Sequence, residues 1–145
     1  MAGVEAILED FNRLKSNCEK LAGQKILVGI VGGADSEVLI VAHAHEYGVP
    51  GKLPERSYLR ASFDSDQDEL TQIVSTQVSK VLSGDTSAEA AANSIGAQAA
   101  QLVQGYIDEN RVTPPSDYSK KRVEVTLYET GTHIRDRISW KVEGA

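Results

Sequence analysis

Histidine and paired acidic side chains are the residue types most often used for metal binding and acid–base catalysis, and few of them lie close together here. His43, His45 and Glu46 form one such group, and His133 stands far along the chain. Histidines two positions apart face opposite sides of a strand or diverge on a helix, whereas a zinc-binding helix places them four apart. No nucleophile or oxyanion motif accompanies them. We therefore expect no catalytic centre, no metal and no cofactor, with His45 as a hydrogen-bonded structural residue and Glu46 as the anchor of the following loop.

A glycine-rich stretch and a single cysteine offer two further chemical possibilities. Gly29, Gly32 and Gly33 resemble a nucleotide-binding loop, but such a loop must open a helix that holds the pyrophosphate. The next residues are instead turn formers and another apolar run, so 25–31 and 37–42 are expected to form the two strands of a hairpin. Cys18 falls on the apolar stripe of a helix, which favours a place in the core over a reactive thiol.

Composition indicates a single soluble domain covering 1–145. The chain is large enough for a hydrophobic core, its one cysteine excludes an internal disulfide, and no apolar run approaches the ~20 residues of a membrane span. The net charge of −6 makes free nucleic acid an unfavourable partner. Neither a membrane nor a specific nucleic acid is expected as a partner, and synthesis in a cytoplasm is expected.

The apolar periodicity predicts the elements that position these residues. An amphipathic helix is expected over 3–22, a sheet and an extended arm over 25–63, helices over 64–110 and strands over 123–143. Asp64 with Gln67 is typical of a capping box, and Thr86 with Glu89 repeats the pattern. A short helical turn at 132–137 is an alternative to strand. The fold class is therefore α+β: a small, mainly antiparallel sheet of three to four strands packed against two or three helices, with a long extended loop.

The stretch from Ala42 to Asp64 has the highest density of turn formers and large amphipathic side chains. Two prolines and Gly51 forbid a helix over 49–57 and predict an ordered, exposed arm over 49–60. Aromatic residues and arginine are the types that anchor protein interfaces. The interface candidates here are Tyr47, Lys52, Pro54, Arg56, Tyr58 and Arg60. The alternative is that Tyr58 and Leu59 pin the loop to the core, and both functions are compatible.

The same stretch carries a resemblance to a known family. The pattern HEYG, a short irregular stretch and then LPERSYLR resembles the signature of tailed-bacteriophage tail-completion, neck or virion-morphogenesis proteins, with Ser57 where a proline is common. A second signature of that family is similar to Leu127-Tyr-Glu-Thr130-Gly131 followed by Ile134-Arg135 and Ile138-Ser-Trp140. There the chain has an extra residue after Gly131. The residues matched as structural motif are His45, Glu46, Gly48, Thr130, Gly131 and Trp140.

The resemblance implies a structural virion protein and no enzyme. Such a minor tail protein would complete the tail or neck for head–tail joining as a homo-oligomeric, hexameric ring. The ring would contact the tail tube, terminator or connector proteins, and DNA would pass through it. A head–tail connector or tail terminator is the alternative, and a small ligand-binding regulatory module is a more remote one.

Charge is distributed unevenly along the chain. Residues 61–110 carry one basic and eight acidic side chains, and 111–145 carry seven basic and five acidic ones. One interpretation is a solvated acidic helix face. The other is charge complementarity between neighbouring copies, which sets register more than affinity. The candidates for such contacts are Asp64, Asp66 and Asp68 on one side and Arg135, Arg137 and Lys141 on the other.

Overall fold

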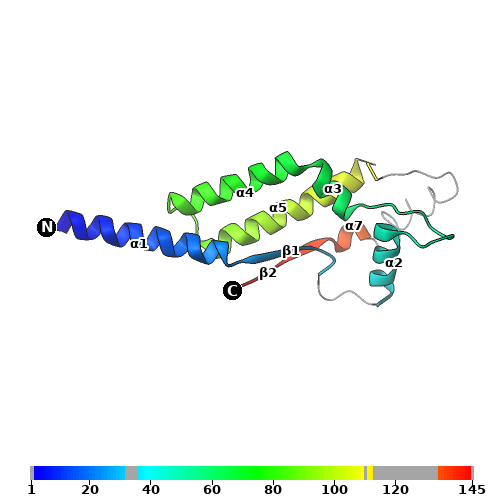
Figure 1. Ribbon diagram of the computed structural model, residues 1–145, viewed down its shortest axis with the longest axis horizontal. Coiled ribbons are helices and arrows are strands. Elements are labelled where there is room, and N and C mark those ends of the chain that lie inside the picture. The colour runs from blue at the N-terminus through cyan, green and yellow to red at the C-terminus, as the bar shows by residue number, and fades with distance from the viewer. Residues whose placement is uncertain (1, 32–35, 110, 113–133, 145) are drawn as a thin grey trace.

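A computed structural model describes residues 2–31, 36–109, 111–112 and 134–144. The helices are α1 (Ala2–Ala22), α2 (Ser36–Tyr47), α3 (Leu59–Ser65), α4 (Gln67–Leu82), α5 (Ala88–Asp108) and α7 (Ile134–Arg137), and the strands are β1 (Lys25–Gly29) and β2 (Ser139–Glu143). The molecule is elongated, with the start of α1 at one end and α2 near the other (Figure 1). A membrane-spanning helix needs a long, almost wholly apolar segment, and the described helices contain no such segment.

The sheet is an antiparallel pair in which Lys25 lies opposite Glu143 and Gly29 opposite Ser139. The α+β class is therefore confirmed at the coarse level, but the described part of the chain has two strands and not three or four. The expected strand over 123–128 lies outside the described residues, as does the turn at 32–35. The short helix expected as an alternative at 132–137 is present as α7, and it leads directly into β2.

The segment 37–42 is not the second strand of a hairpin, because it forms the first half of α2. The buried residues of α2 are Val38, Ala42, His45 and Glu46. These positions are three or four apart, which places them on one face of a helix. An apolar helical periodicity cannot be recognised in this segment of the sequence, because two of the four residues on the buried face are polar. His43 and His45 therefore point in different directions, and His43 is exposed.

Helix α5 is the central element of the fold, since it packs against α4 on one side and against both strands on another (Figure 1). Its start is capped by Ser87, whose hydroxyl accepts a hydrogen bond from the Ala90 amide at 3.1 Å, so the expected cap at Thr86 is wrong by one residue. The buried face carries the small residues Ala91, Ala92, Ala99 and Ala100 and the larger Val103 and Ile107.

The glycine in α5 provides room for β2. A Cβ at Gly96 would lie 2.5 Å from Cδ1 of Trp140, so only glycine lets the indole ring sit against the helix. The Trp140 ring N–H also donates a hydrogen bond to Asn93 Oδ1 at 3.2 Å. The small residues of α5 thus allow a side chain from β2 to approach the helix closely.

Helix α1 confirms the expected amphipathic helix, but only part of its apolar stripe is covered. Its second half packs on α4 and α5, where Leu14 and Leu21 are half-buried. Cys18 is also half-buried and does not lie deep in the core. The first half projects beyond the end of α4 and α5 (Figure 1), and its apolar residues are exposed.

Candidate protein-interface site

Glu46 anchors the loop, as expected, by bonding to the start of α3. Its side chain is buried, and its two oxygens accept hydrogen bonds from the Tyr58, Leu59 and Arg60 amides at 2.9–3.0 Å. The Ser57 hydroxyl donates to Oε1 at 2.8 Å and receives the Ala61 amide at 3.0 Å. The first amides of a helix have no partner within it. The side chains of Glu46 and Ser57, both outside α3, therefore accept hydrogen bonds from the unpaired amides at its N-terminus.

Arg60 completes this arrangement by closing α3 onto α2. Its Nε donates to Glu46 Oε1 at 2.9 Å, and its NH2 group donates both to the Glu46 carbonyl and to Glu55 Oε1 at 2.7 Å. The guanidinium carbon lies 4.4 Å from the centre of the Tyr47 ring, which in turn contacts His43. The hydrogen bond that Arg60 donates to Glu46 raises the pKa of the guanidinium, so this cation is permanent.

The hydrogen bonds around Glu46 also determine its ionisation. Burial acts to raise the pKa of the Glu46 carboxyl, but hydrogen bonds from Leu59, Arg60 and Ser57 outweigh it, and the net pKa is below the ordinary value. The side chain is therefore an acceptor-only carboxylate at neutral pH. With its oxygens occupied, it has no capacity left to act as a general base.

Two of the expected interface residues are instead part of the core. Tyr58 is 3% exposed, and its hydroxyl donates to the Ala42 carbonyl at 3.1 Å, while burial raises the pKa of that hydroxyl. Arg56 is equally buried; its NH2 group donates to the Val112 carbonyl at 3.5 Å and its amide to the His45 carbonyl at 2.9 Å. Their expected presentation at the surface is wrong, because the Tyr58 side chain fastens the arm to α2 and the Arg56 side chain fastens it to Val112, which follows α5.

His45 is a buried structural residue, but within the described part of the chain its Nδ1 lacks the hydrogen bond that the sequence predicts. Nδ1 is buried and has no hydrogen-bond partner among the described residues. Burial, and secondly the charge of Arg56, lower the pKa of the imidazole below its usual 6.5. His45 is thus held neutral within the α2–arm packing.

Gly48 ends α2 and allows the arm to fold back beside it. It has a φ of +75°, and its amide donates to the Ala44 carbonyl at 2.8 Å. A Cβ here would meet the Glu55 amide nitrogen at 2.7 Å and the Leu53 carbonyl at 3.0 Å. The Val49 amide donates to the Leu53 carbonyl at 2.7 Å and makes the arm a tight turn. Lys52 and Pro54 are exposed in or beside that turn.

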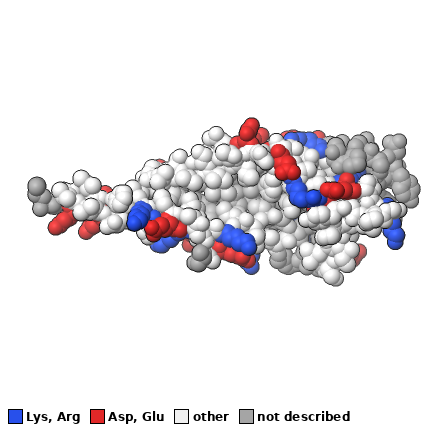
Figure 2. Space-filling model, viewed as in Figure 1, with Lys and Arg blue, Asp and Glu red and all other residues white. Residues whose placement is uncertain are grey.

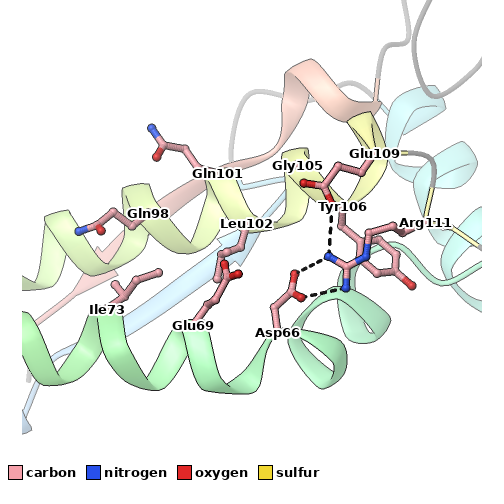
Figure 3. Close-up of a pocket in the computed structure, with 10 residues that line it drawn as sticks. All are labelled: Asp66, Glu69, Ile73, Gln98, Gln101, Leu102, Gly105, Tyr106, Glu109 and Arg111. Atoms are coloured by element: carbon pink, nitrogen blue, oxygen red, sulfur yellow. Dashed lines mark hydrogen bonds and ion pairs between the residues drawn. The ribbon is translucent and has the colours of Figure 1, made fainter.

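The acidic helix start is more fragmented than the sequence predicts, because α3 and α4 meet at Asp66. Asp64 lies inside α3, so it does not open a helix, and Asp66 makes no capping hydrogen bond. Asp66 instead accepts two hydrogen bonds from Arg111, at 2.9 and 3.1 Å, while Arg111 lies over the Tyr106 ring at 4.7 Å (Figure 3). Asp68 remains exposed in the first turn of α4.

The same ion pair lies at one end of a groove of about 300 Å³ between α4 and α5, shown in Figure 3. The groove is also lined by Glu69, Gln98, Gln101 and Glu109. Among its described lining residues, Arg111 is the one cation; it is already bound to Asp66 and lies 3.6 Å from Glu109. The described lining therefore offers amide, carboxylate and phenol groups but no free cation, which gives little support to a small anionic ligand.

The basic C-terminal surface is also partly used within the chain. Arg135 donates two hydrogen bonds to Asp108, each 2.9 Å long, and a third to Asp136 at 3.1 Å. Three of the five N–H groups of its guanidinium are therefore engaged within the chain, and its side chain is 35% exposed. Arg137 is exposed, and Lys141 lies 3.6 Å from Glu143. Figure 2 shows charges of opposite sign in mixed groups around a broad uncharged area.

The structure brings together His45, Glu46, Gly48, Arg56, Tyr58 and Arg60, with Tyr47, Lys52 and Pro54 exposed beside them. Thr130 and Gly131 lie outside the described residues, and Trp140 belongs to the separate contact with α5. Sequence reasoning missed Ser57, Glu55 and Arg111. Ser57 precedes the start of α3 as a capping residue does, and this pattern can be recognised in the sequence. The Arg111–Asp66 pair spans 45 positions, and no local sequence pattern indicates it.

Among the described residues, no group of three or more metal-ligating side chains is close enough to hold an ion. Comparison of the chain with family models, curated proteins and solved structures gave no match. The assignment of function therefore depends on the geometry above and on the motif resemblance.

Proposed function

We propose that the chain is a structural subunit of a tailed-phage virion, located at the head–tail junction or tail end. It completes the tail or neck for head–tail joining as a homo-oligomeric ring of six copies. The observation that carries this proposal is the bonding of Glu46. The residues of the HEYG and LPERSYLR motifs form one hydrogen-bonded unit, in which Glu46 and Arg60 connect α2 to the start of α3.

This use of the motif favours a scaffold over an enzyme. Glu46 is the buried carboxylate of the site, and all of its hydrogen bonds hold backbone or structural side chains. A general base must instead reach a substrate proton. What the unit provides is a rigid support that holds the turn at 49–54 outward, with Tyr47, Lys52 and Pro54 exposed. A rigid, exposed turn suits a contact with an adjoining ring or with the tail tube.

The proposal is tested by interrupting the gene in the phage that encodes it. An amber codon at Glu46 should yield full heads and separate tails in a non-suppressing host, and a plasmid copy of the wild-type gene should restore joined particles. Electron microscopy of the lysate distinguishes this from the alternatives: a terminator defect gives tails of abnormal length, and a connector defect gives heads that lose DNA. Normal infectious particles from the amber phage would contradict the proposal.

A further inference from the structure

The large exposed hydrophobic side chains gather mainly at the two ends of the molecule. One group is the tip stripe, defined here as Val4, Ile7, Leu8 and Phe11 of α1, with Ile7 70% exposed. The other is the α2 groove, with Ile40 69% exposed, which is lined by Leu39, Ile40, His43, Ala44 and Val49. Figure 1 places the start of α1 and helix α2 toward opposite ends of the long axis.

The tip stripe has the character of a surface that is covered in the assembled protein. Its residues recur at three- and four-residue spacing and continue, along the same helix face, the stripe that Leu14 and Leu21 pack against α4 and α5. A helical segment of about ten residues without tertiary contacts is only marginally stable in water. The projecting half of α1 is thus stabilised when something packs on this face.

The α2 groove is an apolar surface of matching kind. It has a volume of about 350 Å³, and four of its five lining residues are aliphatic. It lies on the side of α2 opposite the buried face that carries His45 and Glu46. Because Glu46 and Arg60 fix α2 to the arm, the groove is held in shape before any partner arrives.

We propose that the tip stripe of one copy docks in the α2 groove of the next copy. This inference rests on the proposed ring and names the two surfaces that build it. A head-to-tail ring requires two unlike patches on each subunit, and the described chain carries two such apolar patches toward opposite ends. One copy thereby covers the exposed apolar surface of its neighbour, and each interface repeats around the assembly.

The charges on the first half of α1 favour a second copy of the chain over a lipid surface as the partner of the tip stripe. The first half of α1 carries Glu5, Glu9 and Asp10 and has no basic side chain before Arg13, whereas helices that lie on membranes have basic polar faces. Lys52 stands in the turn next to the groove residue Val49. Lys52 attracts the acidic first half of α1, whereas Glu37, in the first turn of α2, repels it.

The size of the contact favours a repeated assembly over a freestanding dimer. One face of a ten-residue helix, about 15 Å long, presents on the order of 300 Å². Stable interfaces bury roughly 800 Å² per partner. A single stripe-in-groove contact is therefore small, but in a closed ring each copy makes it twice and adds the surfaces beside it.

Cysteine pairs test the contact directly. In a Cys18→Ser background at about 100 μM protein, Ile7→Cys and Ile40→Cys are introduced singly and together, and a short bismaleimide is added. The double variant should give a ladder of multimers, and a mixture of the two single variants should give dimers. Each single variant alone should give at least tenfold less product. Glu9→Cys combined with Ile40→Cys is the matched control, because Glu9 lies on the opposite side of α1 from Ile7, and it should also give at least tenfold less.

Three results would overturn the inference. Dimers of the Ile7→Cys variant alone would show that α1 pairs with α1. Equal cross-linking of the Glu9→Cys control would show random encounter, and absence of the ladder would show that the two surfaces do not meet. The phage experiment tests the function separately. If rings form without this cross-link, the contact is wrong and the proposed function still stands. If the ladder forms but the phage does not need the chain for particles, the proposed function is wrong and the contact still stands.

Discussion

At the residue scale, the structure depends most on the bonds that Glu46 receives. The buried carboxylate accepts hydrogen bonds from the otherwise unpaired amides at the start of α3 and from the half-exposed guanidinium of Arg60. Removing one partner from such a network leaves the others buried and unsatisfied, at a cost of several kcal/mol. We therefore expect Glu46→Gln to lower the free energy of unfolding by about 3 kcal/mol, because the new amide turns a donor toward backbone donors.

Urea denaturation followed by circular dichroism measures this change. The control is Glu55→Gln, which removes the exposed partner of the same arginine and should change stability by less than about 0.5 kcal/mol. A Glu46→Gln variant as stable as the control would contradict the anchoring role.

His45 gives the molecule a pH-dependent stability at the same scale. Burial and Arg56 lower its pKa in the folded state, so the unfolded chain binds the proton more readily. The stabilisation is therefore complete above about pH 6.5 and is lost as the pH falls toward the folded-state pKa. We expect the free energy of unfolding to fall by up to about 1.4 kcal/mol per pH unit below about pH 6.5.

Denaturation curves from pH 7.5 to 5.5 test this dependence. His45→Gln should flatten it, whereas His43→Gln, at an exposed position on the other side of α2, should leave it unchanged. An unchanged slope in His45→Gln would assign the effect to other groups.

At the element scale, the turn after α2 is specified by Gly48. Both Gly48 and Gly51 have positive φ, but only at Gly48 would a Cβ collide with backbone atoms of the arm, namely Glu55 N and Leu53 O. Gly51→Ala should therefore cost about 1 kcal/mol for its conformation alone. Gly48→Ala should cost about 3 kcal/mol, because the arm must also move. Thermal unfolding of the two variants compares their stabilities. Equal losses of stability would show that the arm is not tightly packed against Gly48.

The helices show which elements could be predicted from the sequence. The regular apolar spacing of α1 and α5 placed them within a few residues, because their buried faces are apolar. Helix α2 was mistaken for a strand because its buried face includes His45 and Glu46. The start of α3 at Leu59 is hard to predict because three of its first amides bond to Glu46, which is distant in the chain, and only Ser57 gives a local capping signal.

The candidate site was predictable in its residues but not in their arrangement. The motifs indicated Glu46 as an anchor, and the structure confirms that bond. Exposure could not be read from residue type, since Arg56 and Tyr58 resemble interface anchors yet are buried. Ion pairs such as Asp66–Arg111 and Asp108–Arg135 join distant segments and follow only from the packing.

At the scale of the whole molecule, these ion pairs change the expected role of charge in assembly. Asp66 and Arg135 are neutralised within the chain, whereas the tip stripe and the α2 groove are exposed and apolar. We expect assembly to change little between about 0.1 and about 1 M NaCl, over which the screening length falls from about 10 to about 3 Å. Sedimentation velocity at both salt concentrations checks this. Dissociation at high salt would instead favour contacts through Asp64, Asp68, Arg137 and Lys141.

We propose that this chain is a scaffold subunit that works as a closed ring. Native mass spectrometry of the untagged full-length protein tests it most directly, because it counts the copies in each assembly. We expect one dominant species of fixed stoichiometry, six copies by the motif resemblance, without a series of intermediate masses. A protein that stays monomeric at about 100 μM, or that forms an open series of increasing masses, would contradict it.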